Sequence, residues 1–306
     1  MRRIQNWSVF FAVIRKSGIF ANDMNKKIIS IIIVAAGLVM ASCRDTAKQP
    51  VAQQGQDERQ ETFFDNSASA EVNKQKQKKK SKNLELPARS KGGDEIVLHR
   101  KGYTVSYDKQ RKTPRWVAWH LTADHAQGDV ERHENLFHDD LDVPSPRATD
   151  NDYYNSGYDR GHMCPAGDNK WSRDAMNETF LFTNICPQVH GLNAGAWNDL
   201  ELACRSWARK YGDVYIACGP IYEGTPRTIG RNRVAVPTAF FKVILCMRGQ
   251  GAPKSIGFIY PNASTSRKMF SYAMSVDEVE RRTGIDFFTN LEDNTEEQVE
   301  HTRGYF

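Results

Sequence analysis

The sequence has no apolar stretch long enough to cross a membrane. Its longest mainly apolar run, residues 28–40, has about thirteen residues, whereas a transmembrane helix needs about twenty. The run follows the charged pair Lys26-Lys27 and precedes the small residues Ala41-Ser42, which is the pattern of an export signal. The sequence therefore predicts an exported protein.

Cysteine is scarce, and no two of the six cysteines have the C-x-x-C spacing of a structural zinc site. Cys43 follows the small residues and resembles the lipid-attachment site of bacterial lipoproteins; the alternative is a plain secretory signal with an incidental cysteine. Two interpretations stay open for the other five, namely one or two disulfides in an oxidising envelope or buried thiols. Burial is favoured for Cys164, Cys186 and Cys204, which lie within the polar motifs described below.

The main part of the chain also lacks an excess of positive charge. The formal net charge of +5 arises in residues 1–42, which hold six basic residues and one acidic residue, and residues 43–92 hold eleven and seven. Residues 93–306 hold 25 basic and 29 acidic residues. A general basic surface for nucleic acid is therefore excluded here, and any contact with DNA has to come from local arginines and a metal.

These changes in composition predict three parts. Residues 1–42 are interpreted as a signal peptide, with a second start at Met24, and residues 43–92 as a disordered, Lys/Gln-rich tether. Within the tether, the lysines of residues 74–82 form either a solvated spacer or a loose attachment to DNA or to an anionic surface. Residues 93–306 are the folded domain. We expect it in the bacterial envelope, facing the periplasm or at the cell surface, held to the membrane by a lipid on Cys43.

Short apolar runs around one long helix predict an α+β domain with a central antiparallel sheet. The expected strands are residues 95–99, 103–107, 115–122, 180–185, 214–218, 238–247 and 255–260. The expected helices are residues 172–177, 193–210 and 275–282. Residues 123–155 are polar and acidic, and we expect an irregular excursion there.

Two polar motifs about thirty residues apart carry the chemistry. In Asp159-Arg160-Gly161-His162, a neutral His162 can take a proton from water and Arg160 can neutralise phosphate oxygens. What this motif lacks is a metal. If Asn193 opens a helix, Glu201 and Arg205 follow it at spacings of eight and twelve residues and lie on the same helix face as Asn193. We expect the side-chain oxygens of this face to lie beside the first motif.

The motifs D-R-G-H, N-x-x-P-Q and L-N-x-G-x-W, followed by Glu201 and Arg205, resemble the DNA/RNA non-specific endonuclease family over residues 93 to 290. The resemblance implies a ββα-metal fold, with His162 on the ββ part and Asn193 on the α part. It also implies cleavage of DNA and RNA without sequence specificity, dependent on Mg²⁺ with Mn²⁺ as a substitute, giving 5′-phosphate products.

The resemblance also implies a role for each residue. His162 is the general base, Asn193 the metal ligand, and Glu201 the partner of the metal's waters. Asn184 positions the histidine loop or the phosphate. Structural alternatives are a helix N-cap for Asn193, a surface ion pair between Glu201 and Arg205, and a turn at Asn184.

Arg160 and Arg205 are expected to stabilise the extra negative charge of the transition state. The family often has a further phosphate-binding arginine upstream, and His120 stands at the position where we expect it. Two other functions stay open. One is a catalytically weak nucleic-acid-binding envelope lipoprotein, and the other is a phosphodiesterase for a small substrate, which would need a closed pocket.

Overall fold

The structure is a computed structural model and describes residues 82–90, 95–132 and 136–306, which lie in the compact unit Phe63–Phe306. The predicted signal peptide, Cys43 and the lysines before Lys82 lie outside the described residues. Among the described residues, no helix is long and apolar enough to span a membrane.

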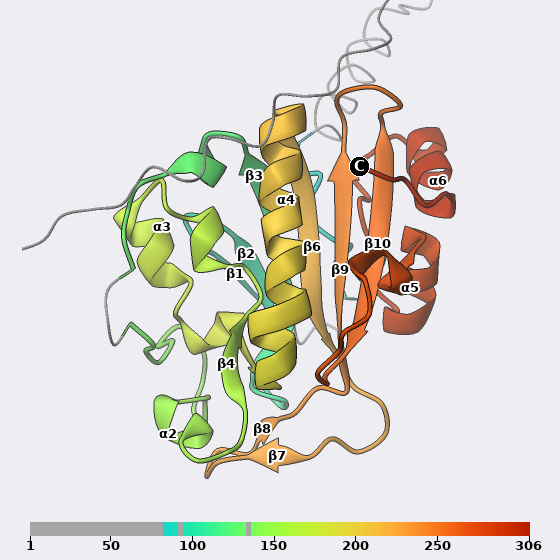
Figure 1. Cartoon of the computed structure of the whole chain (residues 1–306). Coiled ribbons are helices and arrows are strands. Elements are labelled where there is room, and N and C mark those ends of the chain that lie inside the picture. The colour runs from blue at the N-terminus through green and yellow to red at the C-terminus, as the bar shows by residue number, and fades with distance from the viewer. Residues whose placement is uncertain (1–81, 91–94, 133–135) are drawn as a thin grey trace, which may run out of the picture. The chain divides into compact units, whose positions relative to one another are not determined.

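The centre of the domain is a seven-stranded sheet in which all neighbouring strands are antiparallel (Figure 1). In spatial order, its strands are β1 (Ile96–His99), β2 (Thr104–Asp108), β3 (Thr113–Thr122), β6 (Asp213–Ile221), β9 (Ala239–Cys246), β10 (Lys254–Pro261) and β11 (Ala273–Met274). The helices are α2 (Asp150–Tyr153), α3 (Arg173–Glu178), α4 (Asn198–Tyr211), α5 (Val276–Thr283) and α6 (Asp293–His301).

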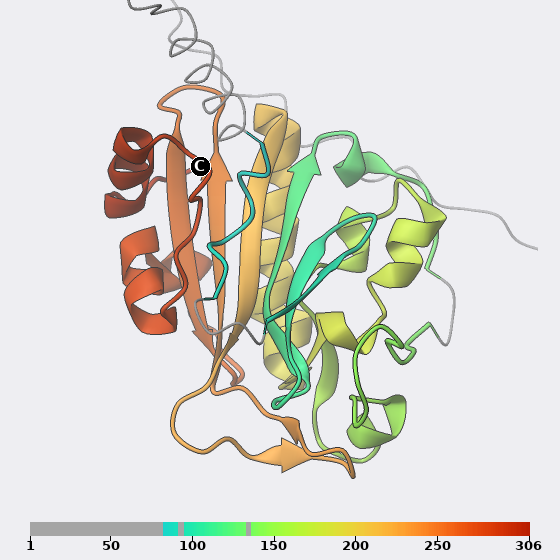
Figure 2. The ribbon, with the colours of Figure 1, turned by 180° about the vertical axis from the view of Figure 1, so that it is seen from behind.

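The sheet is buried on both faces because apolar side chains point alternately to opposite sides of its strands. On β3, Val117 and Trp119 join the apolar cluster that includes α4, whereas Ala118 joins the cluster that includes α5 and α6. Figure 1 shows α4 lying across one face, and the view from behind shows the other face (Figure 2). Helix α4 therefore lies on one side of the sheet, and α5 and α6 pack on the other.

A second, two-stranded unit lies beside α4 and carries the first polar motif. Its strands are β4 (Asp159–His162) and β5 (Ile185–Gln188), paired antiparallel so that Gly161 lies opposite Cys186. A Cβ atom on Gly161 would come within 2.3 Å of the Gln188 side chain, which explains why the motif has glycine here. Together with α4, β4 and β5 form the ββα arrangement expected from the resemblance.

The predicted α+β class and the central antiparallel sheet are confirmed, and two elements are corrected. Residues 180–185 are not a strand; Phe182–Asn184 forms a 3₁₀ turn and β5 begins at Ile185. The long helix begins with a π-helical segment, Leu192–Trp197, in which Gly195 has non-helical backbone angles. It ends as expected, at Gly212 with φ of 96°.

The elements that were not predicted include α6 and a short hairpin formed by β7 (Thr228–Ile229) and β8 (Val234–Ala235). The short elements α2 and β11 were not predicted either. The predicted start of the folded domain at residue 93 is too late. Leu84 is buried against the α5 side of the sheet. The Ala88 amide donates to the Asp286 carbonyl at 2.8 Å, and the Asn290 side-chain amide donates to the Asn83 carbonyl at 2.9 Å.

All five described cysteines are buried and free, so of the two interpretations left open, buried thiols are correct for them and disulfides are wrong. Cys164, Cys186 and Cys204 pack in the α4-side core as small apolar side chains, as the sequence favoured. Burial raises the pKa of each of these thiols, which keeps them unreactive.

Candidate active site

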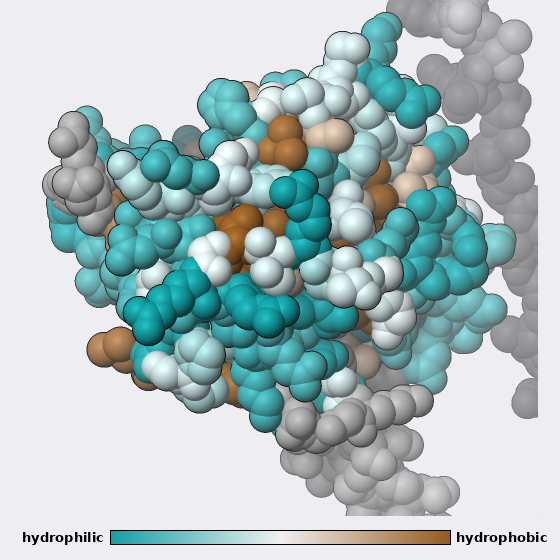
Figure 3. Space-filling view, turned by 90° about the horizontal axis from the view of Figure 1, so that it is seen from below, coloured by the Kyte–Doolittle hydropathy of each residue, from teal (hydrophilic) through white to brown (hydrophobic). Residues whose placement is uncertain are grey.

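An open cavity of about 650 Å³ lies between β4, the π-helical segment and the start of α4. Its wall brings together residues of both polar motifs, which are Tyr158, Asp159, Arg160, His162, Pro165, Ala166, Gly167, Asn193, Ala194, Asn198, Glu201 and Arg205, with Arg132 and Phe137 from the excursion before them. Viewed from the end of the sheet where α4 begins, the surface is mainly hydrophilic, with small hydrophobic areas between polar side chains (Figure 3).

His162 lies at the end of β4 and is held between aromatic rings. Its imidazole packs edge-on against Phe180, with ring centroids 4.9 Å apart, and at 5.4 Å from Phe137. The Trp197 indole donates to the His162 carbonyl at 3.2 Å. These contacts fix both the ring and the backbone.

The Nε2 atom of His162 is buried and has no hydrogen-bond partner within the part of the chain that the structure describes. Burial and, to a smaller extent, the positive charge of Arg132 lower the pKa of His162 to about 3. The imidazole is therefore neutral at pH 7. An unpaired buried nitrogen costs stability, and this nitrogen belongs to a residue that lines the cavity, where its lone pair is able to accept a proton.

Asn193 is joined to the first motif by a hydrogen bond. Its side-chain Nδ2 donates to Asp159 Oδ2 at 2.9 Å, and His190 Nδ1 lies 2.9 Å from the same oxygen. Because the contact with Asp159 uses the NH₂ group, the amide oxygen of Asn193 is left for another partner. Asn193 is not a helix N-cap, since Gly191 occupies that position.

Arg205 is fixed by a buried carboxylate that the sequence did not reveal. Its Nη1 atom lies 2.7 Å from Asp168 Oδ1, while the Trp119 indole donates to Asp168 Oδ2 at 3.0 Å. The alternative of a surface ion pair with Glu201 is therefore wrong. Asp168 follows Gly167, where a Cβ atom would come within 2.9 Å of Arg205, so the glycine permits the close approach.

Glu201 lies in the same wall, and burial raises its pKa to about 7. A buried lysine lies close enough to interact electrostatically with Glu201. Lys242 on β9 is fully buried, its Nζ atom is 4.3 Å from the Trp197 ring centroid, and it has no hydrogen-bond partner among the described residues. Its positive charge opposes the rise in the pKa of Glu201, and so favours the ionised carboxylate that a cation requires.

Two further arginines reach the cavity. Arg160 pairs with Asp150 of α2 at 2.5 Å. This ion pair holds the guanidinium group of the first motif in place. Arg132 lies over the Phe180 ring at 4.8 Å and was not predicted. It lies in the irregular excursion with no motif around it, so nothing in the sequence marked it.

Two residues that the sequence associated with the site do not line the cavity. Asn184 is fully buried; its Oδ1 accepts from the Cys164 amide at 2.9 Å and its Nδ2 donates to the Cys164 and Thr179 carbonyls. It therefore holds the chain that follows His162 and does not reach a phosphate. His120 stacks on Tyr215 and lies 3.1 Å from Asp213, so it does not occupy the place of a phosphate-binding arginine.

The donors in the cavity fit a hard divalent cation. The oxygens of Asn193 and Glu201 lie in one wall, and oxygen is the ligand that Mg²⁺ prefers. None of the described cysteines lines the cavity, and the neutral His162 is placed to accept a proton rather than to serve as one of several nitrogen ligands. A buried neutral base, three arginines and such oxygens on a ββα unit define a metal-dependent, phosphodiester-cleaving class of protein.

The comparisons with known proteins agree with this class. The family model of the DNA/RNA non-specific endonucleases matches residues 79–294. The chain belongs to that family, and the resemblance carried by the motifs is confirmed.

Three similar proteins illustrate the relationship. The chain is 39% identical to mitochondrial nuclease EXOG of Danio rerio over 205 residues, which is 62% of this chain and 60% of that protein, so less than two thirds of EXOG is matched. It is 39% identical to nuclease C1 of Cunninghamella echinulata var. echinulata, covering 65% of this chain and 84% of that protein. With human mitochondrial endonuclease G, identity is 36% over 63% of this chain and 69% of that protein.

Among solved structures, the complex of EndoG with EndoGI matches with a TM-score of 0.61 and 33% identity, over 65% of this chain and 88% of the other. That complex shows an inhibited state of EndoG. The ββα-metal fold expected from the sequence is thereby confirmed.

Proposed function

We propose that this protein is a metal-dependent endonuclease that hydrolyses phosphodiester bonds in DNA and RNA without sequence specificity. Mg²⁺ is the proposed cofactor, with Mn²⁺ as a substitute, and the products carry 5′-phosphates. The observation that carries this proposal is the neutral His162, whose Nε2 atom is unpaired among the described residues in a cavity that also holds Asn193 and three arginines.

In this proposal, the residues of the cavity have different roles in hydrolysis. His162 accepts a proton from the attacking water, which activates a poor nucleophile. Arg205, fixed by Asp168, is placed to stabilise the additional negative charge on the phosphate. Asn193 and Glu201 would hold the cation, which when bound supplies charge neutralisation and helps the leaving oxygen depart.

A plasmid-nicking assay on the full chain tests the reaction class. We expect supercoiled DNA to be nicked in Mg²⁺, EDTA to abolish nicking, and added Mg²⁺ or Mn²⁺ to restore it. Single-stranded RNA in the same buffers tests the wider substrate range. Binding of DNA without cleavage at any concentration of Mg²⁺ or Mn²⁺ would favour the alternative of a nucleic-acid-binding lipoprotein.

A basic hairpin near the cavity supplies local positive charge on a domain that is otherwise acidic. It spans residues 227–235, which comprise Arg227, β7, β8 and the turn between the strands, and it exposes Arg227, Arg231 and Arg233. None of the three forms an ion pair with a residue that the structure describes. A phosphate backbone that leaves the cavity on this side would therefore meet three guanidinium groups.

The basic hairpin is connected to the site through α2. Asn232 donates to Asp152 from its backbone amide and from its side-chain amide, both at 2.9 Å. Asp150, at the start of the same helix, pairs with Arg160. The hairpin is thus held in a fixed place relative to Arg160 and can guide a long substrate.

Changing all three hairpin arginines to glutamine should weaken binding of long duplex DNA. The slope of log K against log salt concentration should become shallower by up to about 2.7, because each phosphate contact contributes about 0.9. The kcat on a short duplex should change less than about twofold, since the cavity is intact. The matched control is Arg281→Gln with Arg282→Gln on α5, which should leave the slope unchanged. An unchanged slope in the hairpin variant would exclude this surface.

The location stays a prediction of the sequence. We propose an exported lipoprotein of the bacterial envelope, attached through Cys43, because the export signal and the lipid-attachment pattern precede the folded domain. The predicted tether would then let the cavity reach nucleic acid beyond the membrane surface.

A further inference from the structure

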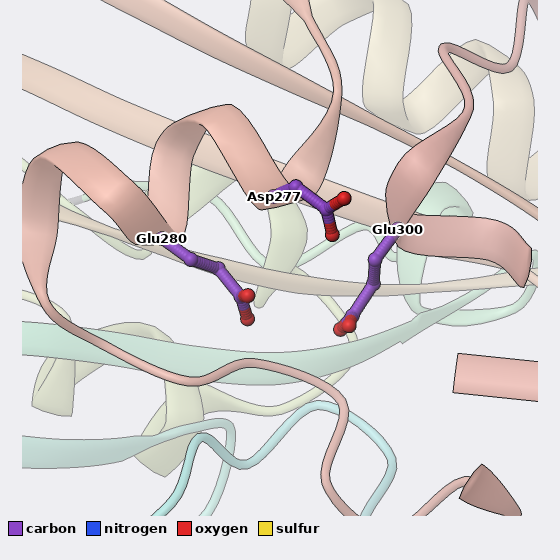
Figure 4. Close-up of side chains that lie close together, drawn as sticks. All are labelled: Asp277, Glu280 and Glu300. Carbon is purple, nitrogen blue, oxygen red and sulfur yellow. The ribbon is translucent and has the colours of Figure 1, made fainter. Parts of the chain in front are cut away.

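Three carboxylates meet on the side of the sheet opposite α4. Asp277 and Glu280 lie on α5 and Glu300 lies on α6, and their carboxylate oxygens are all within 4.8 Å of one another. Figure 4 shows the three side chains pointing toward one another across the gap between the two helices. The group belongs to the layer that includes Val276, Val279 and Val299, so it is separated by the sheet from α4 and the catalytic cavity. We refer to Asp277, Glu280 and Glu300 as the acidic triad.

Glu300 is the unusual member of the acidic triad. It is only 5% exposed, and its Oε1 atom is buried without a hydrogen-bond partner among the described residues. A buried carboxylate with an unpaired oxygen is unfavourable unless a positive charge or a hydrogen-bond donor balances it.

The surrounding residues supply little balancing charge. Glu280 accepts from the Phe287 amide at 2.7 Å, and His301 Nδ1 lies 3.2 Å from Asp277 Oδ2. The two arginines of α5, Arg281 and Arg282, both pair with Glu278 instead. Among the described residues, no lysine or arginine forms a salt bridge with the acidic triad.

We propose that the acidic triad is a Ca²⁺ site that joins α5 to α6. Ca²⁺ binds oxygen ligands at 2.3–2.6 Å in flexible geometry, so any two oxygens bound to one ion lie no more than about 5 Å apart. The oxygens of the acidic triad lie within 4.8 Å of one another and so meet this limit, and all three ligands are carboxylates. Mg²⁺ requires a tighter octahedron and Zn²⁺ prefers nitrogen and sulfur ligands. One Ca²⁺ would leave a formal charge of −1 in place of three mutually repelling carboxylates.

The position of α6 gives the ion a structural role. After α6, the Gly304 amide donates to the Ser255 carbonyl of β10 at 2.7 Å, and Phe306 stacks on Trp207 of α4 with ring centroids 4.7 Å apart. The chain that begins at the acidic triad therefore crosses to the helix that carries Glu201 and Arg205. A bound Ca²⁺ fixes the start of this closing segment, and its effect is on stability rather than on the chemical step.

Thermal unfolding of the full chain, first stripped with EDTA, tests the site. Adding Ca²⁺ at about 100 times its Kd should raise the Tm of the wild type by roughly 5 °C or more. The gain should fall below about 2 °C in Asp277→Asn and Glu300→Gln, and equilibrium dialysis with radioactive Ca²⁺ should show one ion fewer in each. Glu297→Gln, which removes an exposed charge of α6 outside the acidic triad, should keep the full gain.

The variants separate this site from the catalytic one. Ca²⁺ bound in the catalytic cavity would shift the Tm of all four proteins alike, so only the difference between them reports the acidic triad. Nicking by Asp277→Asn in saturating Mg²⁺ at 25 °C should equal that of the wild type.

If Glu300→Gln does not fold, Asp277→Asn still tests the proposal, because the Asp277 side chain is 45% exposed and its replacement should not prevent folding. Equal increases in Tm on adding Ca²⁺ to all four proteins would overturn the proposal. A Glu300→Gln variant that is more stable than the wild type with or without Ca²⁺ would also overturn it, since Glu300 would then be a buried protonated acid.

Discussion

Replacing His162 by alanine should lower the kcat for nicking by at least about 100-fold, which is about 2.7 kcal/mol of activation free energy. The change removes the proton acceptor and leaves the three arginines and the oxygens of Asn193 and Glu201 in place. DNA binding in EDTA should therefore change little, so the loss should appear in kcat and not in KM. Rates measured at neutral pH over a range of duplex concentrations separate the two. Near wild-type turnover in His162→Ala would show that another group is the base.

The matched control is His120→Ala. His120 stacks on Tyr215 outside the cavity, so its loss should leave the rate within about twofold of the wild type. A large loss of kcat with an unchanged Tm would place His120 in the site after all.

The protonation state of His162 gives an independent check of the same assignment. Because its pKa is lowered to about 3, the folded protein holds the imidazole neutral while the unfolded chain binds a proton below about pH 6.5. Its contribution to folding is therefore complete above pH 6.5 and declines as the pH falls from there toward 3. NMR of the His162 ring should show no protonation between pH 8 and pH 5. A midpoint near 6.5 would mean that the ring is solvated and not enclosed.

The sequence predicted the parts of the site that helix geometry places together. Asn193, Glu201 and Arg205 lie in one cavity wall because steps of four residues return to the same helix face, even though Gly195 interrupts the regular helix. Asp168 and Arg132 could not be predicted in this way. Each reaches the site through contacts far along the chain, with Arg205 in one case and with Phe180 in the other.

The fold likewise has elements that the local sequence predicted and one segment whose conformation depends on contacts with distant residues. Short apolar runs predicted β3 and β9 because both strands bury side chains on the two faces of the sheet. The alternation of apolar residues misled at residues 180–185. There Phe180 packs against the His162 ring and Phe182 packs against Phe137 and Tyr153, all outside the central sheet. The chain turns so that Asn184 can bind the backbone of Cys164. The two phenylalanines are apolar because they pack beneath the site, and neither lines the cavity.

The second large effect should follow from Asn193→Ala, which removes the amide oxygen proposed to bind the cation. The Mg²⁺ concentration for half-maximal rate should rise at least about 10-fold. The kcat at saturating Mg²⁺ should also fall, because the cation would be held less firmly against the phosphate. Initial rates from micromolar to tens of millimolar Mg²⁺ measure both, and Mn²⁺ binding followed by electron paramagnetic resonance measures affinity without turnover.

Glu201→Gln is the comparison that assigns the ligand. If Glu201 acts on the waters of the cation, this variant should raise the Mg²⁺ requirement by less than Asn193→Ala does, since a neutral oxygen still lies in the cavity wall. Burial holds the pKa of Glu201 near 7, so in the wild type protons and the cation should compete for this carboxylate. The Mg²⁺ requirement should therefore increase from pH 8 to pH 6, and Glu201→Gln should abolish that pH dependence. An unchanged metal titration in Asn193→Ala, together with a large shift in Glu201→Gln, would make Glu201 the direct ligand and leave Asn193 the role of holding Asp159.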